Sequence, residues 1–160
     1  MNTFNISPDP QIPQEIIEAE NIVLAECMWD IHGEALLIAR QYLKKEFFSR
    51  KSGRLIFALL CELQDNDQGW MKDQIIQHFD YDEEHPGMAE YIYDLDEAFT
   101  YQDCRYFSRE IAKEANERQL GYAISLIIEN AYRPFADPYR IFAELKSSVK
   151  KYSERKAAIK

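Results

Sequence analysis

One stretch of the sequence constrains the fold more than any other. Residues 101–130 contain no proline and only one glycine, Gly121. Side chains that can line a packing seam recur in it at intervals of three and four residues, namely Cys104, Phe107, Ile111, Ala115, Arg118, Tyr122 and Leu126. Because an α-helix has about 3.6 residues per turn, this spacing predicts one long helix with a continuous packing seam.

The second half of this helix has a further apolar stripe, which consists of Leu120, Ile124, Ile127 and Ile128. A helix that is apolar over much of its circumference is buried on more than one side. The stripe therefore contacts either the rest of the domain or another copy of the same helix. We expect self-association and take these four residues as the candidate oligomer interface.

A second helix is predicted to follow the long one after a turn that contains Pro134. Asp137 and Pro138 form a strong helix start, an aspartate N-cap followed by proline at the first helical position. The apolar seam of this closing helix is narrow and consists of Phe142, Leu145, Val149 and Tyr152. The two helices are expected to form an antiparallel hairpin.

Shorter helices are predicted for the first hundred residues. Apolar side chains recur at helical spacing within 14–28, 35–45, 52–63, 71–79 and 88–98. The whole chain of 160 residues contains only 5 glycines and 6 prolines, too few turn formers to separate the strands of a large sheet. The sequence thus predicts an all-α fold, a compact helical head followed by an antiparallel helical hairpin.

Proline content and charge divide the chain into four predicted parts. Residues 1–13, with three prolines and few apolar residues, are expected to be a flexible leader. The helical head is expected to span 14–99 and the hairpin 100–153. Residues 154–160 are expected to be a basic tail or the start of a linker.

Charge and cysteine usage limit the partners and the compartment. The net charge of −9 opposes binding to phosphate backbones, so nucleic acid is expected to bind at most weakly. Any such binding is expected at the basic C-terminal segment 146–160, which includes Lys150, Lys151 and Lys156 and ends in the tail. The three cysteines form no Cys-x-x-Cys motif, which is typical of reduced thiols in a cytoplasmic protein. No apolar stretch has the length that a membrane span needs, so we expect no contact with a membrane.

No motif for catalysis, cofactor binding or metal binding is complete. The Asp65-x-Asp67-x-Gly69 segment is similar to a calcium loop, but its glycine comes one place early and Ile76 occupies the position of the closing glutamate. There is no Gly-rich phosphate loop and no nucleophile elbow, and the acidic run 80–84 is interpreted as solvated. Most of the tyrosines and phenylalanines are interpreted as core residues rather than as a base-stacking surface. We therefore expect a non-catalytic protein that binds protein partners.

With the helices in this order, the chain resembles the N-terminal domain of DnaB-type replicative DNA helicases. The segment Ile17–Ala25 is similar to the opening helix of that family, although Ala25 stands where the family usually has glycine. Phe47-Phe48 followed by Leu55–Ala58 and Leu63 resembles its next motif, with a spacing one residue longer and without the family's histidine. The long and closing helices resemble its hairpin at Phe107-Ser108, Ile111, Arg118, Leu120 and 137–149.

The resemblance covers about residues 13–152 and implies a specific role. In that family the domain is joined to a separate ATPase domain, forms the oligomeric collar of the helicase ring and contributes to docking the primase. The resemblance thus implies ring assembly and docking of primase or a helicase loader during DNA replication. From the residues alone, a freestanding all-helical adaptor with no role in replication is the alternative.

Overall fold

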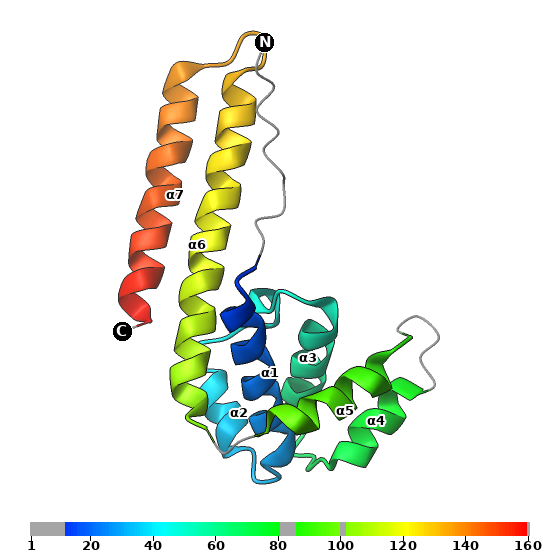
Figure 1. The fold of residues 1–160 in the computed structure, drawn as a ribbon. Helices are drawn as coiled ribbons and strands as arrows, with labels where there is room; N and C mark the ends of the chain where they lie inside the picture. Colours follow the sequence, from blue (N-terminus) through cyan, green and yellow to red (C-terminus); the bar gives the residue numbers. More distant parts are fainter. Residues whose placement is uncertain (1–11, 81–85, 100–101, 160) are drawn as a thin grey trace. The chain divides into compact units, whose positions relative to one another are not determined.

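The computed structural model describes residues 12–80, 86–99 and 102–159. Within these ranges the chain contains α-helices and one short 3-10 helix, and no strand (Figure 1). The elements are α1 (Gln14–Trp29), α2 (Glu34–Ala39), η1 (Lys45–Phe47), α3 (Lys51–Asp65), α4 (Lys72–Asp80), α5 (Met88–Ala98), α6 (Cys104–Ala131) and α7 (Pro138–Ala158). The predicted all-α fold is confirmed. The predicted leader lies outside the described residues except for its last two positions.

From Pro13 onward the chain divides into two compact units, Pro13–Ala112 and Lys113–Lys160. We call them the head and the hairpin unit. The boundary between them falls inside α6, so this helix begins in one unit and ends in the other. The four-part division drawn from the sequence stays a prediction.

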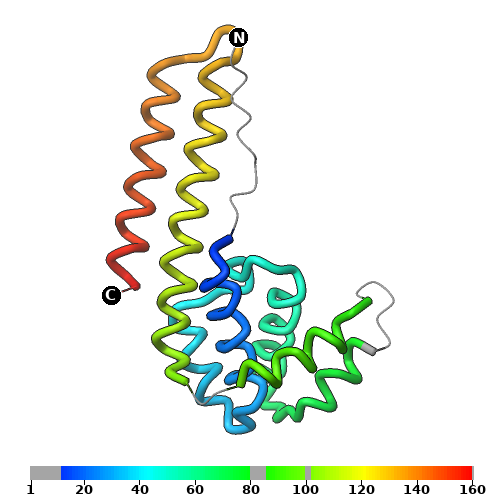
Figure 2. Tube along the Cα trace, viewed as in Figure 1, coloured from blue at the N-terminus to red at the C-terminus, as the bar shows by residue number. Residues whose placement is uncertain are grey.

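Helix α1 is the centre of the head. It packs against α2, α3 and α5, and the path of the chain around it can be followed in Figures 1 and 2. Val23, Leu24 and Cys27 on α1 are fully buried. The indole Nε1 of Trp70 donates a hydrogen bond to the carbonyl oxygen of Cys27 at 3.2 Å, which fixes the connection between α3 and α4 to α1. The head core is therefore built around one helix that is covered on several sides.

The break between α1 and α2 is held by the side chain of Asp30. The carboxylate of Asp30 accepts hydrogen bonds from the backbone N–H groups of His32, at 3.0 Å, and Ala35, at 2.7 Å. Gly33 precedes α2 with a φ of 74°, a left-handed conformation that glycine adopts without steric cost. Through Ala35, Asp30 therefore satisfies an N–H group that the start of α2 leaves without a helical partner.

Replacing Gly33 with alanine is expected to destabilise the head. The new side chain would have to adopt the left-handed conformation, and its Cβ would lie 2.9 Å from the Nε2 atom of Gln64. Together these effects should lower the free energy of unfolding by about 2 kcal/mol, as measured by urea titration. Gly87→Ala is the matched control, because Gly87 also has a positive φ, whereas no atom of the described residues other than its chain neighbours lies within 4 Å of the position that a Cβ would occupy. Equal losses in the two variants would show that the contact with Gln64 costs nothing.

The hairpin unit consists of the second part of α6, a short turn and α7, which runs antiparallel to α6 (Figure 1). Asp137 is the N-cap of α7, and its carboxylate accepts a hydrogen bond from the N–H of Tyr139 at 3.0 Å. Pro138 is the first helical residue, so the predicted helix start is confirmed. Helix α7 continues to Ala158 and includes most of the predicted basic tail.

Candidate protein-interaction surfaces

Helices α6 and α7 face each other through partly polar side chains. The amide Nδ2 of Asn116 donates to the carbonyl oxygen of Tyr152 at 3.2 Å, and Arg155 donates to Gln119. A cavity of about 160 Å³ lies between the helices and is lined by Asn116, Gln119, Leu120, Ala123, Ser148, Lys151, Tyr152 and Arg155. Helix α7 therefore turns Ser148 and Tyr152, and not its most apolar stripe, toward α6.

The prediction that one apolar seam of α7 packs inside the hairpin is wrong for the first three residues of that seam. Phe142, Leu145 and Val149 are 67%, 36% and 45% exposed, and no residue of α7 is buried. The predicted seam of α6 is wrong at its end, since Tyr122 and Leu126 are also exposed, whereas Ile111 and Ala115 are buried. Periodicity identifies an apolar stripe, but it does not say which element covers that stripe.

The four residues of the predicted interface differ in exposure. Leu120 lines the cavity between the helices, and Ile127 is buried with 8% exposure. Ile124 is partly exposed, and Ile128 is 41% exposed. Surface that a partner could cover is thus concentrated at Ile124 and Ile128, and Leu120 and Ile127 pack mainly within the chain.

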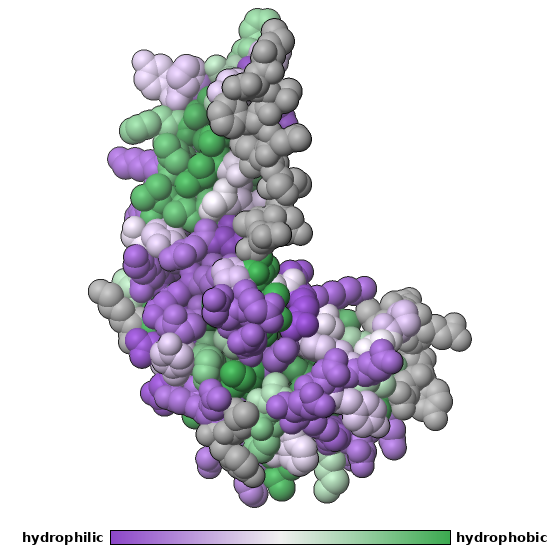
Figure 3. Space-filling model, viewed as in Figure 1, coloured by the Kyte–Doolittle hydropathy of each residue, from purple (hydrophilic) through white to green (hydrophobic). Residues whose placement is uncertain are grey.

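Exposed apolar residues of both helices share one side of the hairpin unit. Successive residues of a helix are rotated by about 100°, so Ile124 and Ile128 lie to one side of the cavity-lining positions of α6. The same geometry on the antiparallel α7 places its outward stripe on that side. Figure 3 shows hydrophobic side chains gathered on the hairpin unit. We call this surface the hairpin face and define it as Ile124, Ile128, Phe142, Leu145 and Val149.

The turn between α6 and α7 is also aromatic and exposed. Tyr132, Phe135 and Tyr139 are 86%, 104% and 87% exposed. Phe135 has a φ of 65°, a left-handed conformation that costs a non-glycine residue about 1–2 kcal/mol. These three aromatic residues are therefore exceptions to the prediction that most tyrosines and phenylalanines are core residues. For Tyr132 and Phe135, the position beside Pro134 and between two helices was the signal that could have identified them as surface residues.

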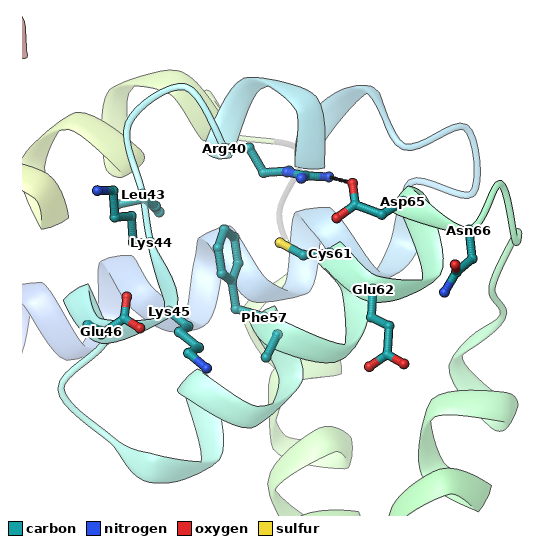
Figure 4. A pocket seen from close by; sticks show the side chains of 11 residues that line it. Arg40, Leu43, Lys44, Lys45, Glu46, Phe57, Cys61, Glu62, Asp65 and Asn66 are labelled. Atoms are coloured by element: carbon teal, nitrogen blue, oxygen red, sulfur yellow. Dashed lines mark hydrogen bonds and ion pairs between the residues drawn. The ribbon is translucent and has the colours of Figure 1, made fainter.

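A groove in the head lies between the α2–η1 connection and α3 (Figure 4). It has a volume of about 570 Å³. Its less polar lining comes from Leu43, Phe57, Ala58 and Cys61, and its charged lining from Arg40, Lys44, Lys45, Glu46, Glu62 and Asp65. One guanidinium nitrogen of Arg40 donates to Oδ1 of Asp65 at 2.8 Å and to Oε1 of Gln64 at 2.9 Å. We call this surface the head groove; it combines an apolar floor with charges of both signs at its rim.

The ionisation of Cys61 and Arg40 in the head groove suits binding of a partner and not catalysis. Burial raises the pKa of the Cys61 thiol, so this group stays neutral at physiological pH and is a poor nucleophile. The hydrogen bond to Asp65 raises the pKa of Arg40, which therefore stays charged. The groove offers a fixed cation, an apolar floor and a neutral thiol. None of these is an activated acid, base or nucleophile.

A buried carboxylate joins the start of α3 to α1. Glu20 has no exposed surface and accepts hydrogen bonds from the N–H of Ser49, at 2.6 Å, and from its hydroxyl, at 2.8 Å. Next to it, Asn21 accepts from Arg50 at 2.6 Å and from the hydroxyl of Tyr91 at 3.1 Å. Burial raises the pKa of Tyr91. These groups are engaged in hydrogen bonds within the head, which is a structural role.

Neither a metal site nor a membrane span is found in the described part of the chain. Its histidines, cysteines and carboxylates do not come together in groups of three that could hold an ion. None of its helices has both the length and the apolar character that crossing a bilayer requires. Most of the acidic run 80–84 lies outside the described residues.

Comparison with known proteins identifies relatives of the fold. The family model of the DnaB-like helicase N-terminal domain matches residues 12–113. The crystal structure of the N-terminal domain of DnaB helicase from Mycobacterium tuberculosis is similar, with a TM-score of 0.73 and 15% sequence identity. That match covers 84% of this chain and 96% of the other. At this identity it is a likeness of fold. No curated protein matches the sequence.

Proposed function

The chain belongs to the family of DnaB-like helicase N-terminal domains, and from this we propose that it is the non-catalytic domain through which a replicative DNA helicase assembles its ring. In this proposal the domain also docks the primase or a helicase loader during DNA replication in the cytoplasm. We assign no ATP hydrolysis to this chain, because its sequence has no Gly-rich phosphate loop.

The hairpin face is the observation that supports self-assembly. Its members on α7 are more than a third exposed, although this stripe is the most apolar part of the helix. A contiguous apolar surface is costly to leave in water, and surfaces of this kind mark protein interfaces. A second copy would cover the hairpin face with an identical face, the arrangement found in two-fold symmetric dimers.

The predicted interface residues enter this proposal in two groups. Ile124 and Ile128 contribute directly to the surface between copies, together with the outward stripe of α7. Leu120 and Ile127 support α6 from within the hairpin unit. Primase or loader would use surface outside the hairpin face, because the second copy occupies that face.

Self-association is the first expected result. Light scattering on the purified chain at micromolar concentration should report a dimer or a larger species, since an interface that covers a continuous apolar face typically gives stable association. A second measurement, titration with the primase of the same organism, should then detect binding by the assembled chain. A chain that stays monomeric at several hundred micromolar would contradict the assembly role.

A further inference from the structure

The cavity between α6 and α7 is built from polar groups that the proposed assembly does not use. It is lined by one face of each helix, at positions i, i+3, i+4 and i+7, which are Asn116, Gln119, Leu120 and Ala123 on α6 and Ser148, Lys151, Tyr152 and Arg155 on α7. Its volume of about 160 Å³ is roughly ten times the space that one water molecule needs. The cavity can therefore hold a small polyatomic ligand.

A buried acceptor in this lining has no donor. Asn116 is 3% exposed, and its Nδ2 donates to the carbonyl oxygen of Tyr152 at 3.2 Å. Because a carbonyl oxygen can only accept, this hydrogen bond fixes the orientation of the amide and leaves Oδ1 on its other side. Oδ1 is buried and has no hydrogen-bond partner among the described residues. An unsatisfied buried acceptor is costly, so a ligand that donates to Oδ1 would be favoured.

The charge of the lining favours an anion. Lys151 and Arg155 contribute two cations, and no carboxylate of the described residues lines the cavity, although the chain has a net charge of −9. Arg155 already donates to Gln119, whereas Lys151 forms no ion pair with another described residue. The hydroxyl of Ser148 is a further donor. The cavity thus offers a cation and a hydroxyl to an anion, together with one acceptor that lacks a donor.

We propose that this cavity binds inorganic phosphate as the hydrogenphosphate ion. The deprotonated oxygens of the ion accept from Lys151 and Ser148, and its remaining P–OH group donates to Oδ1 of Asn116. The bound ion contacts α6 and α7 at once and thereby holds the two helices together. The inference goes beyond the proposed function and does not depend on it, because all these groups belong to one copy of the chain.

A comparison of anions tests the role of Asn116 without altering the protein. At about pH 8 inorganic phosphate retains one hydroxyl group, whereas sulfate and methyl phosphate are dianions without one. Each anion is titrated into the isotope-labelled chain at constant ionic strength, and the side-chain amide resonances of Asn116 report binding at the cavity. We expect the dissociation constant for phosphate to be at least about 10-fold lower than for either other anion, because only phosphate donates to Oδ1.

Three results of these titrations would overturn the inference. Equal dissociation constants for all the anions would mean that Oδ1 takes no part in binding. Tighter binding of methyl phosphate would indicate a phosphorylated ligand instead of the free ion. Asn116 resonances that stay unchanged at tens of millimolar phosphate would mean that the cavity is not a phosphate site.

Lys151→Gln tests the cation. It should raise the dissociation constant for phosphate by roughly 10-fold, since it removes a charge-assisted hydrogen bond. Lys150→Gln is the matched control, because Lys150 is the neighbouring residue, does not line the cavity and pairs with Glu154 at 3.8 Å. It should change the dissociation constant by less than about 2-fold, because an exposed charge outside the cavity is screened by salt. Equal effects of the two substitutions would mean that phosphate responds only to net charge, which would contradict the inference.

Ser148→Ala tests the hydroxyl donor. It should raise the dissociation constant for phosphate by roughly 5-fold. Ser147→Ala is its control, since Ser147 is exposed on α7 and does not line the cavity. Alanine favours a helix, so both variants should keep their helical circular dichroism. Unchanged binding in Ser148→Ala would contradict the proposed coordination. Light scattering should report the same assembly for all these variants, so a failure to bind phosphate would leave the proposed function intact.

Discussion

Replacing Ile128 with glutamate is expected to convert the assembled chain into monomers while its helices remain intact. Ile128 is 41% exposed, so a charged side chain at this position stays in water when the chain is alone. In an assembly closed through the hairpin face, the same carboxylate would be buried among apolar groups without a partner. The cost of several kcal/mol should raise the dissociation constant of the dimer by at least about 100-fold.

Leu126→Glu is the matched control for this substitution. Leu126 lies on the same helix with the same exposure of 41%, but on the opposite side of α6. Sedimentation equilibrium should therefore find a dimer for Leu126→Glu and a monomer for Ile128→Glu, and circular dichroism should report unchanged helicity for both. The reverse pattern would place the interface on the side of Tyr122 and Leu126. Loss of helicity in Ile128→Glu would mean that Ile128 supports the fold instead.

The second large effect is a loss of stability, and we expect it when Glu20 in the head is replaced. Glu20→Ala removes the carboxylate that accepts hydrogen bonds from both the N–H and the hydroxyl of Ser49. These donors would remain in a partly buried site with no acceptor in place of the carboxylate, and each unsatisfied buried group costs about 1–3 kcal/mol. We expect the free energy of unfolding to fall by about 3 kcal/mol, as measured by urea titration.

Two further variants define the cause of that loss. Glu18→Ala removes an exposed glutamate from the same helix, and its effect should stay within about 0.5 kcal/mol. Glu20→Gln retains one acceptor oxygen and should lose less stability than Glu20→Ala. If Glu20→Ala were as stable as Glu18→Ala, the hydrogen bonds to Ser49 would not hold the start of α3 to α1.

Local chemistry made much of the fold predictable from the sequence. The start of α7 at Asp137-Pro138 and the break at Asp30–Gly33 depend on capping groups and backbone conformation within a few residues. The same holds for the long α6, which has no proline and one glycine over most of its length. Resemblance of short motifs in the right order also predicted the family that the comparison then showed.

The candidate site could be predicted only in part. The stripe with Ile124 and Ile128 was found because its spacing left it without a partner within the hairpin. The outward stripe of α7 was assigned to the inside, since the sequence does not reveal that Ser148 and Tyr152 face α6. The exposed ring of Phe135 and the head groove were not predicted at all, because the ring depends on a turn conformation and the groove combines residues of the α2–η1 connection, η1 and α3.

By itself, the sequence determined which segments are helical, where several of them begin or end, and which stripes are apolar. These properties follow from interactions between residues a few positions apart, whose geometry is the same in every α-helix. Only the tertiary structure decided which stripe is covered and which is left to a partner. That choice depends on how α7 is rotated about its own axis against α6, and this rotation is fixed by contacts such as Asn116 with Tyr152, which join residues far apart in the chain.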